Sequence, residues 1–482
     1  MNNLTPTDLP ESGARATAPG GGSNADAPSF DWPLADRAEA LLRQYIGDFL
    51  EANAFAARLA DRMRDEAGTD FFEWTDHLVV TPEEEPALLN AGLQRVPGMD
   101  SADLVYEHPQ ATLPRVLVRA GRGPVPSSVA LKPEFVADFI ARNDLQVEPE
   151  GEPGSRLRRV IAWREHGTQL EAVERRAYRG FAPAPLAPGG MAAIVKAREL
   201  WQIRPRRFEH EQDGFRVANQ MLERVLGLVG RDLACQFFFE AERAYWQDRN
   251  RAGQIQKRRQ DQLGLGWGNH DHHTFRCSRA HFVDLVEFLL RLGFRKRERY
   301  YAGAQAGWGA QIMEQPMTGI VVFADVDLMP EETQVDFSTT PLPPATRLGT
   351  VGLWVGLHGE SFLEAGMHHL EARFDFERLS EQLQRAGVNM MKPFSNFEFL
   401  RQAFTEGERW PVRRERIERL LRAGLITPEQ GEKFLAEGAL GSHLENLQRH
   451  GGFKGFNQSS VSAVIAATDP RREHFSDAPV AA

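Results

Sequence analysis

The clearest pattern of apolar and polar positions lies in the C-terminal half of the chain. A short strand over residues 272–276 is followed by a segment with apolar residues at helical spacing, which ends at Gly293. Three more strands follow, separated by turns that contain glycine. These strands cover residues 294–301, 309–314 and 319–324. The predicted order of elements is therefore β-α-β-β-β.

A second unit of the same kind begins near Met367. Asp375 is placed to cap a helix after the first strand of this unit, and Gly387 is placed to end that helix. A helical insertion is expected over about 396–440, where Thr427 begins a capping box. The strands expected in this unit cover residues 367–374, 388–393, 442–449 and 461–467.

The rest of the chain has a mixed pattern, and the predicted fold class is α+β. Residues 1–30 are rich in Pro, Gly, Ser and Ala without apolar periodicity, which predicts a disordered tail. Residues 31–262 predict a helix-rich α+β region, in which strand-like and helix-like segments alternate over 70–145. Residues 263–468 would form a domain with both β-α-β-β-β modules, and 469–482 a flexible tail.

Composition narrows the classes of protein to which the chain can belong. Hydrophobic residues make up 42% of it and charged residues 26%, as in ordinary globular proteins. The formal net charge of −10 argues against a general nucleic-acid binder. No window offers the roughly 18 apolar residues that argue for a membrane helix. Cys235 and Cys277 fit neither a disulfide framework nor zinc spacing, which favours the cytoplasm. The oligomeric state stays open.

Three short histidine-containing segments in the C-terminal half carry the candidate chemistry. Side chains alternate across a strand, so His272 and Arg276 share one face of the first segment. His369 and Arg373 likewise share one face of the second, and the third contains Glu445. A strand face that carries both histidine and arginine is a poor core face. It suits a site in which imidazole binds a metal and the nearby guanidinium holds an anionic substrate.

Two imidazoles and one carboxylate on one side of a metal form the facial triad typical of non-haem iron(II) oxygenases. Such a triad leaves three coordination positions open. A 2-oxo acid can fill two of them through its carboxylate and keto oxygens, and dioxygen can take the third. The pattern therefore indicates an iron(II) site built from histidines and a carboxylate of these three segments.

The first of these segments, 271–276, and the elements after it resemble the vicinal-oxygen-chelate superfamily. More narrowly, they resemble the 2-oxoadipate dioxygenase/decarboxylase (hydroxyglutarate synthase) family. In that family the first metal ligand is a histidine, and a substrate-binding arginine follows four residues later. These positions correspond to His272 and Arg276. The resemblance covers about residues 265–468.

The same resemblance places the other ligands. The family's second ligand lies on a strand with an arginine four residues on, which is similar to His369 with Arg373. Its third ligand is a glutamate shortly after a Ser-His pair, which is similar to Glu445. The chain departs from the family in having His368 where the family has asparagine and a second histidine, His273, after the first ligand. These departures bear on the identity of the substrate.

The resemblance implies a cytoplasmic iron(II)-dependent dioxygenase/decarboxylase. Its partners would be dioxygen and a 2-oxo dicarboxylic acid such as 2-oxoadipate. The product would be a 2-hydroxy acid such as 2-hydroxyglutarate, with release of carbon dioxide. The segment that begins at Asp76-His77 is similar to the start of such a module, which favours either a degenerate copy over 70–145 or an ordinary strand with an exposed histidine.

Several alternatives stay open. His443 should share the face of Glu445 and is its rival as the third ligand. Glu371 shares a face with His369 and could either support a ligand or pair with an arginine. A glyoxalase-like isomerase or lyase, with zinc, nickel or manganese, could use the same scaffold. So could a non-catalytic protein that binds a small molecule.

Overall fold

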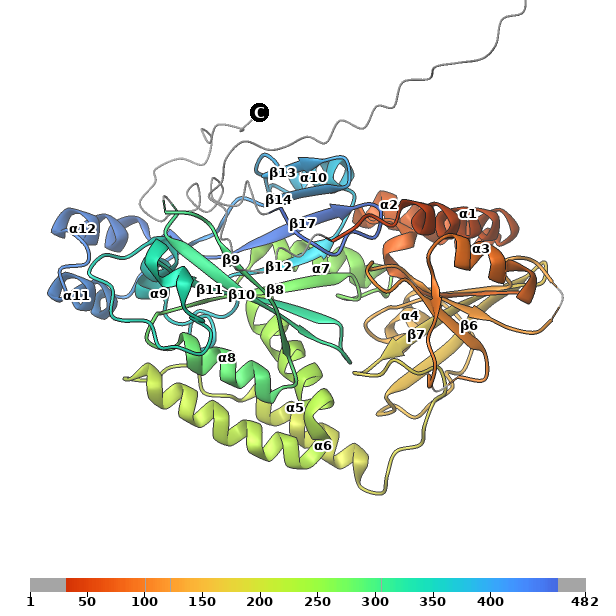
Figure 1. The fold of residues 1–482 in the computed structure, drawn as a ribbon, viewed down its shortest axis with the longest axis horizontal. Helices are drawn as coiled ribbons and strands as arrows, with labels where there is room; N and C mark the ends of the chain where they lie inside the picture. The colour runs from red at the N-terminus through yellow and green to blue at the C-terminus, as the bar shows by residue number, and fades with distance from the viewer. Residues whose placement is uncertain (1–31, 100, 122, 305, 458–482) are drawn as a thin grey trace, which may run out of the picture.

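The computed structural model describes residues 32–99, 101–121, 123–304 and 306–457. Three expected segments lie outside the described residues: the tail over 1–30, the strand over 461–467 and the tail over 469–482. Within the described part, two large β-sheets lie side by side with helices packed around them (Figure 1). The predicted α+β class is confirmed.

The first C-terminal module has the predicted β-α-β-β-β order. Its elements are β8 (His270–Cys277), α8 (Phe282–Arg291), β9 (Arg295–Tyr301), β10 (Trp308–Gln315) and β11 (Ile320–Asp327). β8 and β11 pair in parallel, and β10 lies between β11 and β9. The change from alternating to helical spacing and back predicted each element to within a few residues.

The second module joins the first in one eight-stranded sheet, in the order β13-β14-β17-β12-β8-β11-β10-β9. Its elements are β12 (His369–Arg373), α10 (Phe376–Arg385), β13 (Ser395–Phe397), β14 (Leu400–Phe404) and β17 (His443–Arg449). β12 pairs in parallel with β17 and antiparallel with β8. The sheet therefore brings β8, β12 and β17 next to one another.

Two expectations for this module are wrong. The strand over 388–393 is not formed; the segment makes only an isolated bridge from Met390 to Thr405, and Pro393 lacks the N–H that a ladder needs. The insertion over 396–440 is not wholly helical, because it begins with the β13–β14 hairpin. Pairing of β14 with β17 stabilises that hairpin. The elements further along are β15 (Arg409–Trp410), α11 (Arg414–Arg422), α12 (Pro428–Glu437) and β16 (Ala439–Leu440).

The N-terminal half contains a second sheet, in the order β2-β3-β4-β1-β5-β7-β6. Its strands are β1 (Thr75–Val80), β2 (Gln94–Arg95), β3 (Leu104–Glu107), β4 (Arg115–Val118), β5 (Ser128–Leu131), β6 (Leu157–Glu165) and β7 (Thr168–Arg175). β1 runs parallel to β4 and antiparallel to β5, as β8 does with β11 and β12. With α3 (Glu85–Asn90) after β1, this part repeats the connectivity of the first C-terminal module.

Helices pack against each of the two sheets. α1 (Asp36–Ala52) and α2 (Ala54–Ala67) pack on the N-terminal sheet, and α5 (Gly190–Gln202), α6 (Glu211–Gln247) and α8 pack under the C-terminal sheet (Figure 1). Phe275 and Cys277 of β8 lie in the core between the C-terminal sheet and these three helices, so the even-numbered side chains of β8 point to the opposite face of the sheet. No helix in the described ranges is long and apolar enough to cross a membrane.

A glycine-rich segment before β8 makes the two halves touch. A Cβ atom on Gly268 would lie 2.3 Å from the carbonyl oxygen of Lys132, which follows β5. A Cβ atom on Gly266 would lie 2.4 Å from Glu134 Oε2, and one on Gly264 would lie 2.6 Å from the Cα of Phe139. The backbone at Gly268 and Gly264 therefore passes too close to the backbone after β5 and to helix α4 (Val136–Arg142) for any side chain.

Replacing Gly268 tests this contact. We expect Gly268→Ala to lower the free energy of unfolding by about 1–3 kcal/mol, because the new methyl group meets backbone that cannot move aside. Urea unfolding followed by circular dichroism measures the change. The matched control is Gly227→Ala within α6, where a Cβ meets nothing within 4 Å. That substitution should raise stability by about 0.5–1 kcal/mol. Equal effects of the two substitutions would contradict the contact.

Candidate metal centre

The three predicted ligands lie together on the face of the C-terminal sheet opposite α8, where α9 (Thr350–His358) also packs. His272, His369 and Glu445 come from β8, β12 and β17, and their ligand atoms all lie within 4.8 Å of one another. Glu445 Oε2 is 3.4 Å from His272 Nε2 and 2.9 Å from His369 Nε2. Ligands at right angles on a metal with bonds of about 2.1 Å are about 3.0 Å apart. The three groups thus fit a single cation.

Strand register explains why these side chains meet. The parallel pairing of β12 with β17 sets His369 opposite His443 and Glu371 opposite Glu445. The antiparallel pairing of β12 with β8 sets Thr274 opposite His369. Residues opposite one another in a sheet project from the same face, and so do residues two apart in one strand. His272, His369 and Glu445 therefore point the same way.

Supporting contacts orient His272 and Glu445. The Nδ1 atom of His272 contacts the carboxylate of Glu371, which leaves Nε2 directed at Glu445. Histidines that bind metals typically donate their other N–H to such a partner. Gln402 Nε2 donates to Glu371 Oε1 at 3.0 Å and to Glu445 Oε1 at 3.3 Å. One amide therefore holds both carboxylates.

Burial and mutual charge govern protonation here. Burial lowers the pKa of His272, but the Glu371 and Glu445 carboxylates outweigh it and raise that pKa to about 10. Burial raises the pKa of the Glu371 carboxyl to about 7, and Glu445 adds to this effect. Burial, with the charges of His272 and Arg276, holds the pKa of His369 well below its usual value. A cation bound there would displace a proton from His272, because metal binding releases protons from its ligands.

Two other groups of potential ligands adjoin this one. His368, His369 and His443 form an all-histidine group, in which His443 stacks on Phe404 with ring centroids 4.0 Å apart. That group does not include His272. Within the described residues, Glu445 rather than His443 is the third member of the group that holds both predicted histidines.

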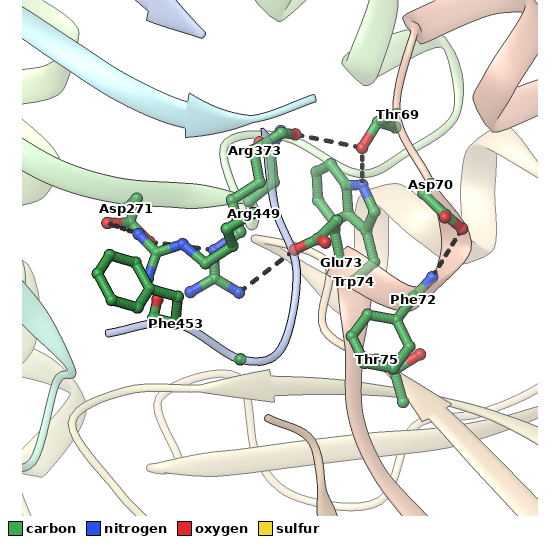
Figure 2. A network of polar contacts seen from close by, with 12 residues as sticks. Thr69, Asp70, Phe72, Glu73, Trp74, Thr75, Asp271, Arg373, Arg449 and Phe453 are labelled. Carbon is green, nitrogen blue, oxygen red and sulfur yellow. Dashed lines mark hydrogen bonds and ion pairs between the residues drawn. The ribbon is translucent and has the colours of Figure 1, made fainter. Parts of the chain in front are cut away.

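The remaining group, Asp271 with His272 and Glu371, uses a carboxylate that is already engaged. Asp271 accepts hydrogen bonds from Arg373 Nε at 3.1 Å and from Arg449 at 3.0 Å (Figure 2). Although burial raises the pKa of Asp271, these two guanidinium groups hold it below its usual value. Asp271 therefore serves as an anchor between strands.

A pocket of about 50 Å³ lies over the three ligands. Arg276, which is only 2% exposed, lines it, as does Asp325, the residue opposite Arg276 on β11. Burial raises the pKa of Asp325 to about 7 even though Arg276 opposes the shift. The rest of the wall is largely aromatic. These aromatic residues are Tyr300, Trp308, Phe323, Phe394, Phe404 and Phe456.

Arg373, the second predicted substrate-binding residue, does not line this pocket. It lines the larger cavity next to it, and its guanidinium lies 3.6 Å from Glu73 as well as bonding Asp271 (Figure 2). Its carbonyl oxygen accepts a hydrogen bond from Thr69 at 3.3 Å. Arg373 thus ties the C-terminal sheet to the N-terminal half, and its role toward a substrate stays a prediction.

Two residues of the site escaped the sequence reasoning. Asp325 shares a face with Val321 and Phe323 in β11 and directly follows the apolar run 320–324, so a charge on that face was a signal that could have found it. Gln402 gave no such signal, because its segment was expected to be helical.

No family model and no curated protein matches the sequence. Solved structures with some likeness include a putative glyoxalase superfamily protein from Ralstonia eutropha JMP134, at 15% identity and a TM-score of 0.31, covering 55% of this chain and 96% of that one. Another is a mutant 4-hydroxymandelate synthase from Streptomyces coelicolor, at 14% identity and a TM-score of 0.28, covering 83% of this chain and 99% of that one. A third is methylmalonyl-CoA epimerase from Mycobacterium tuberculosis, at 12% identity and a TM-score of 0.22, covering 38% of this chain and 88% of that one. All three likenesses are distant.

Metal affinity distinguishes the candidate groups. We expect Glu445→Gln and His369→Ala to weaken binding of a divalent cation by more than about 100-fold, because each removes a ligand. Glu371→Gln should weaken binding roughly 10- to 100-fold, as loss of a ligand's supporting partner does. Anaerobic isothermal titration calorimetry with iron(II) measures the constants.

His443→Ala is the matched comparison for the same titration. It removes a buried imidazole next to His369 but none of the three donors grouped with His272. If His443→Ala abolishes binding while Glu445→Gln leaves it intact, the assignment of Glu445 is wrong. Thermal melting of each variant separates loss of metal from loss of fold.

Proposed function

We propose that this protein is an iron(II)-dependent dioxygenase/decarboxylase that acts on a 2-oxo dicarboxylic acid similar to 2-oxoadipate. The product would be a 2-hydroxy acid similar to 2-hydroxyglutarate, with dioxygen consumed and carbon dioxide released. The observation that carries the proposal is the meeting of His272, His369 and Glu445 under a pocket that Arg276 also lines. The resemblance of these motifs to the 2-oxoadipate dioxygenase/decarboxylase family supports it.

The donor set suits iron(II). Two imidazole nitrogens and one carboxylate oxygen on one side of a metal leave positions open toward the pocket. His272 Nε2, His369 Nε2 and Glu445 Oε2 would hold the ion. When bound, iron(II) would supply the site for the 2-oxo acid and dioxygen and the electrons for oxygen activation.

Arg276 would bind a carboxylate of the substrate. A guanidinium group pairs with a carboxylate through two parallel hydrogen bonds, and burial strengthens this attraction. The neighbouring Asp325 would be protonated in roughly half of the molecules at neutral pH, since its pKa is about 7. In the neutral form it does not repel an anionic substrate and can donate a hydrogen bond to it.

The aromatic wall would exclude water from the reacting end. Phe323 lies against His272, with ring centroids 4.4 Å apart, and Phe404 lies against His369 at 5.2 Å. A dry pocket strengthens every electrostatic contact within it and prevents side reactions of activated oxygen. At about 50 Å³ the pocket suits the 2-oxo acid end of a substrate rather than a whole dicarboxylate.

Oxygen uptake tests the reaction. Protein loaded with iron(II) should consume dioxygen when given 2-oxoadipate, release one carbon dioxide per dioxygen and form 2-hydroxyglutarate. An oxygen electrode and mass spectrometry of the product measure these quantities. The expected control is His369→Ala, without activity. Metal-loaded protein that consumes no oxygen with any 2-oxo acid would refute the proposal, and turnover without oxygen would point to a glyoxalase-like isomerase or lyase.

The role of Arg276 gives a second prediction. Arg276→Lys keeps the charge but loses the planar pair of donors, so kcat/KM for the 2-oxo acid should fall roughly 10- to 100-fold. Steady-state oxygen uptake measures the fall, and iron(II) affinity should stay within about threefold. Arg385→Lys, at an exposed position on α10, is the control. Equal kinetics of the two variants would show that Arg276 does not bind substrate.

A further inference from the structure

A separate cavity, here named the α9 cavity, lies where the C-terminal end of α9 meets α6, β15 and α11. It has a volume of about 520 Å³, within the range of about 300–1,000 Å³ that small-molecule sites cover. Its wall includes Leu357 and His358 of α9, Tyr245 of α6, Trp410 of β15 and Arg416 of α11. None of the described residues lines both the α9 cavity and the pocket over the metal ligands, or both the α9 cavity and the cavity beside that pocket. The proposed substrate site therefore leaves this space unassigned.

Arginines outnumber acids in the wall of the α9 cavity. Among its lining residues, which all belong to the described part of the chain, five are arginines and three are acids, whereas the whole chain has a formal net charge of −10. The arginines are Arg207, Arg249, Arg251, Arg413 and Arg416, and the acids are Asp248, Glu364 and Glu408. Burial lowers the pKa of His358 to about 3, so its imidazole adds no charge. The cavity is therefore a positive region on an acidic protein, and such a region attracts anions.

Helix ends change this charge without reversing it. α6 and α9 end at the cavity, and the C-terminal end of a helix carries roughly half an elementary negative charge. α11 begins there, directly after Arg413, and its N-terminal end carries a partial positive charge of similar size. The three helices together therefore remove about half a charge, which leaves the excess of arginines positive.

Three guanidinium groups share the carboxylate of Glu364. Its oxygen atoms lie 3.0 Å from Arg207, 2.6 Å from Arg413 and 2.9 Å from Arg416. A second carboxylate, that of Glu211, lies 3.7 Å from Arg416. Two carboxylates thus serve three guanidinium groups, so positive charge remains for a further anion.

Two of the cations are held rigidly. The side chain of Arg416, between Glu364 and Glu211, is only 9% exposed. The guanidinium group of Arg249 donates to the backbone carbonyl oxygen of Glu364 at 2.7 Å, and its carbon atom lies 4.1 Å from the ring centroid of Trp410. Donors that are already fixed bind an anion with little further loss of conformational entropy.

Two other cations can adapt to a ligand. The side chain of Arg207 is 76% exposed and that of Arg413 is 47% exposed, although both contact Glu364. Exposed ion pairs contribute little to stability, so turning these guanidinium groups toward a multivalent anion costs little. A guanidinium group matches the oxygen atoms of a phosphate or a carboxylate through two parallel hydrogen bonds. The cavity thus combines fixed donors with adjustable ones.

We propose that the α9 cavity binds a small multivalent anion, either a phosphate ester or a polycarboxylate, through the guanidinium groups of Arg207, Arg249 and Arg413. The anion supplies negative charge that Glu364 alone does not, and the volume of the cavity leaves room for an organic group beyond the charged one. This site is independent of the proposed reaction, because none of the described residues lines both the α9 cavity and the pocket over the metal ligands.

Calorimetric titration of full-length, iron-loaded protein under anaerobic conditions tests the site. The ligands are glucose 6-phosphate, a phosphate ester, and tricarballylate, a tricarboxylate, with acetate as the monovalent comparison at equal ionic strength. At least one of the two multivalent anions should bind at a single site, about tenfold or more tightly than acetate. The anion that does so shows whether the natural ligand carries phosphate or carboxylate groups.

Two substitutions remove cations from the site. Arg413→Gln and Arg207→Gln should each weaken binding of that anion about tenfold or more, because each removes charge-assisted hydrogen-bond donors. Arg385→Gln, whose side chain on α10 is 76% exposed like that of Arg207, is the matched control and should leave the affinity unchanged. Equal losses in Arg385→Gln and Arg207→Gln would reveal general screening of charge and overturn the site. Binding that falls in Arg276→Lys but not in Arg413→Gln would also overturn it, since the anion would then lie over the metal ligands.

The opposite change is expected for Glu364→Gln, which removes the carboxylate that competes with the ligand. Binding of the anion should tighten about tenfold, a gain that a folding defect cannot imitate. The melting temperature of Glu364→Gln should fall, because guanidinium groups lose their partner, and the anion should raise it more than it raises that of the wild type. Thermal melts followed by circular dichroism measure these shifts. An affinity that is unchanged in Glu364→Gln, or a wild type that binds neither multivalent anion more tightly than acetate, would overturn the site.

Discussion

The register of three neighbouring strands is the constraint on which the site depends. β8, β12 and β17 are fixed by backbone ladders, and each contributes one ligand from the same face. A slip of one residue in any strand would turn its side chain toward the helices on the other face. The apolar residues that alternate with the ligands, such as Phe275 and Leu444, prevent this slip because they fill the core beneath the sheet.

The sequence predicted what depends on local pattern. The elements of the first C-terminal module were predicted from the spacing of apolar residues, which changes from alternating to helical and back. The shared face of His272 and Arg276 was predicted from the alternation of side chains along a strand. Gln402 and the β13–β14 hairpin could not be predicted in this way, because only pairing with β17, some 40 residues further along, makes that segment a strand. The capping box at Thr427, a local signal, is present as expected.

The two sheets share connectivity but differ in chemistry. In the described ranges, the three groups of potential metal ligands all lie on the C-terminal sheet. The N-terminal sheet instead lines the adjoining cavity with charged groups such as Arg115 and Arg175. The C-terminal sheet thus carries the potential metal ligands, and the N-terminal sheet forms part of the wall of the cavity beside them.

The anchoring of Asp271 has a thermodynamic consequence. Asp271 is the neighbour of His272 in β8 and is bonded by Arg373 from β12 and Arg449 from β17, while Arg373 also reaches Glu73 in the N-terminal half (Figure 2). The halves therefore cannot separate without disturbing the strands that carry the ligands. A cation bound to these ligands would oppose separation of the two halves, because binding stabilises the conformation that binds it. Binding of a cation at the three ligands and the free energy needed to separate the two halves therefore depend on each other.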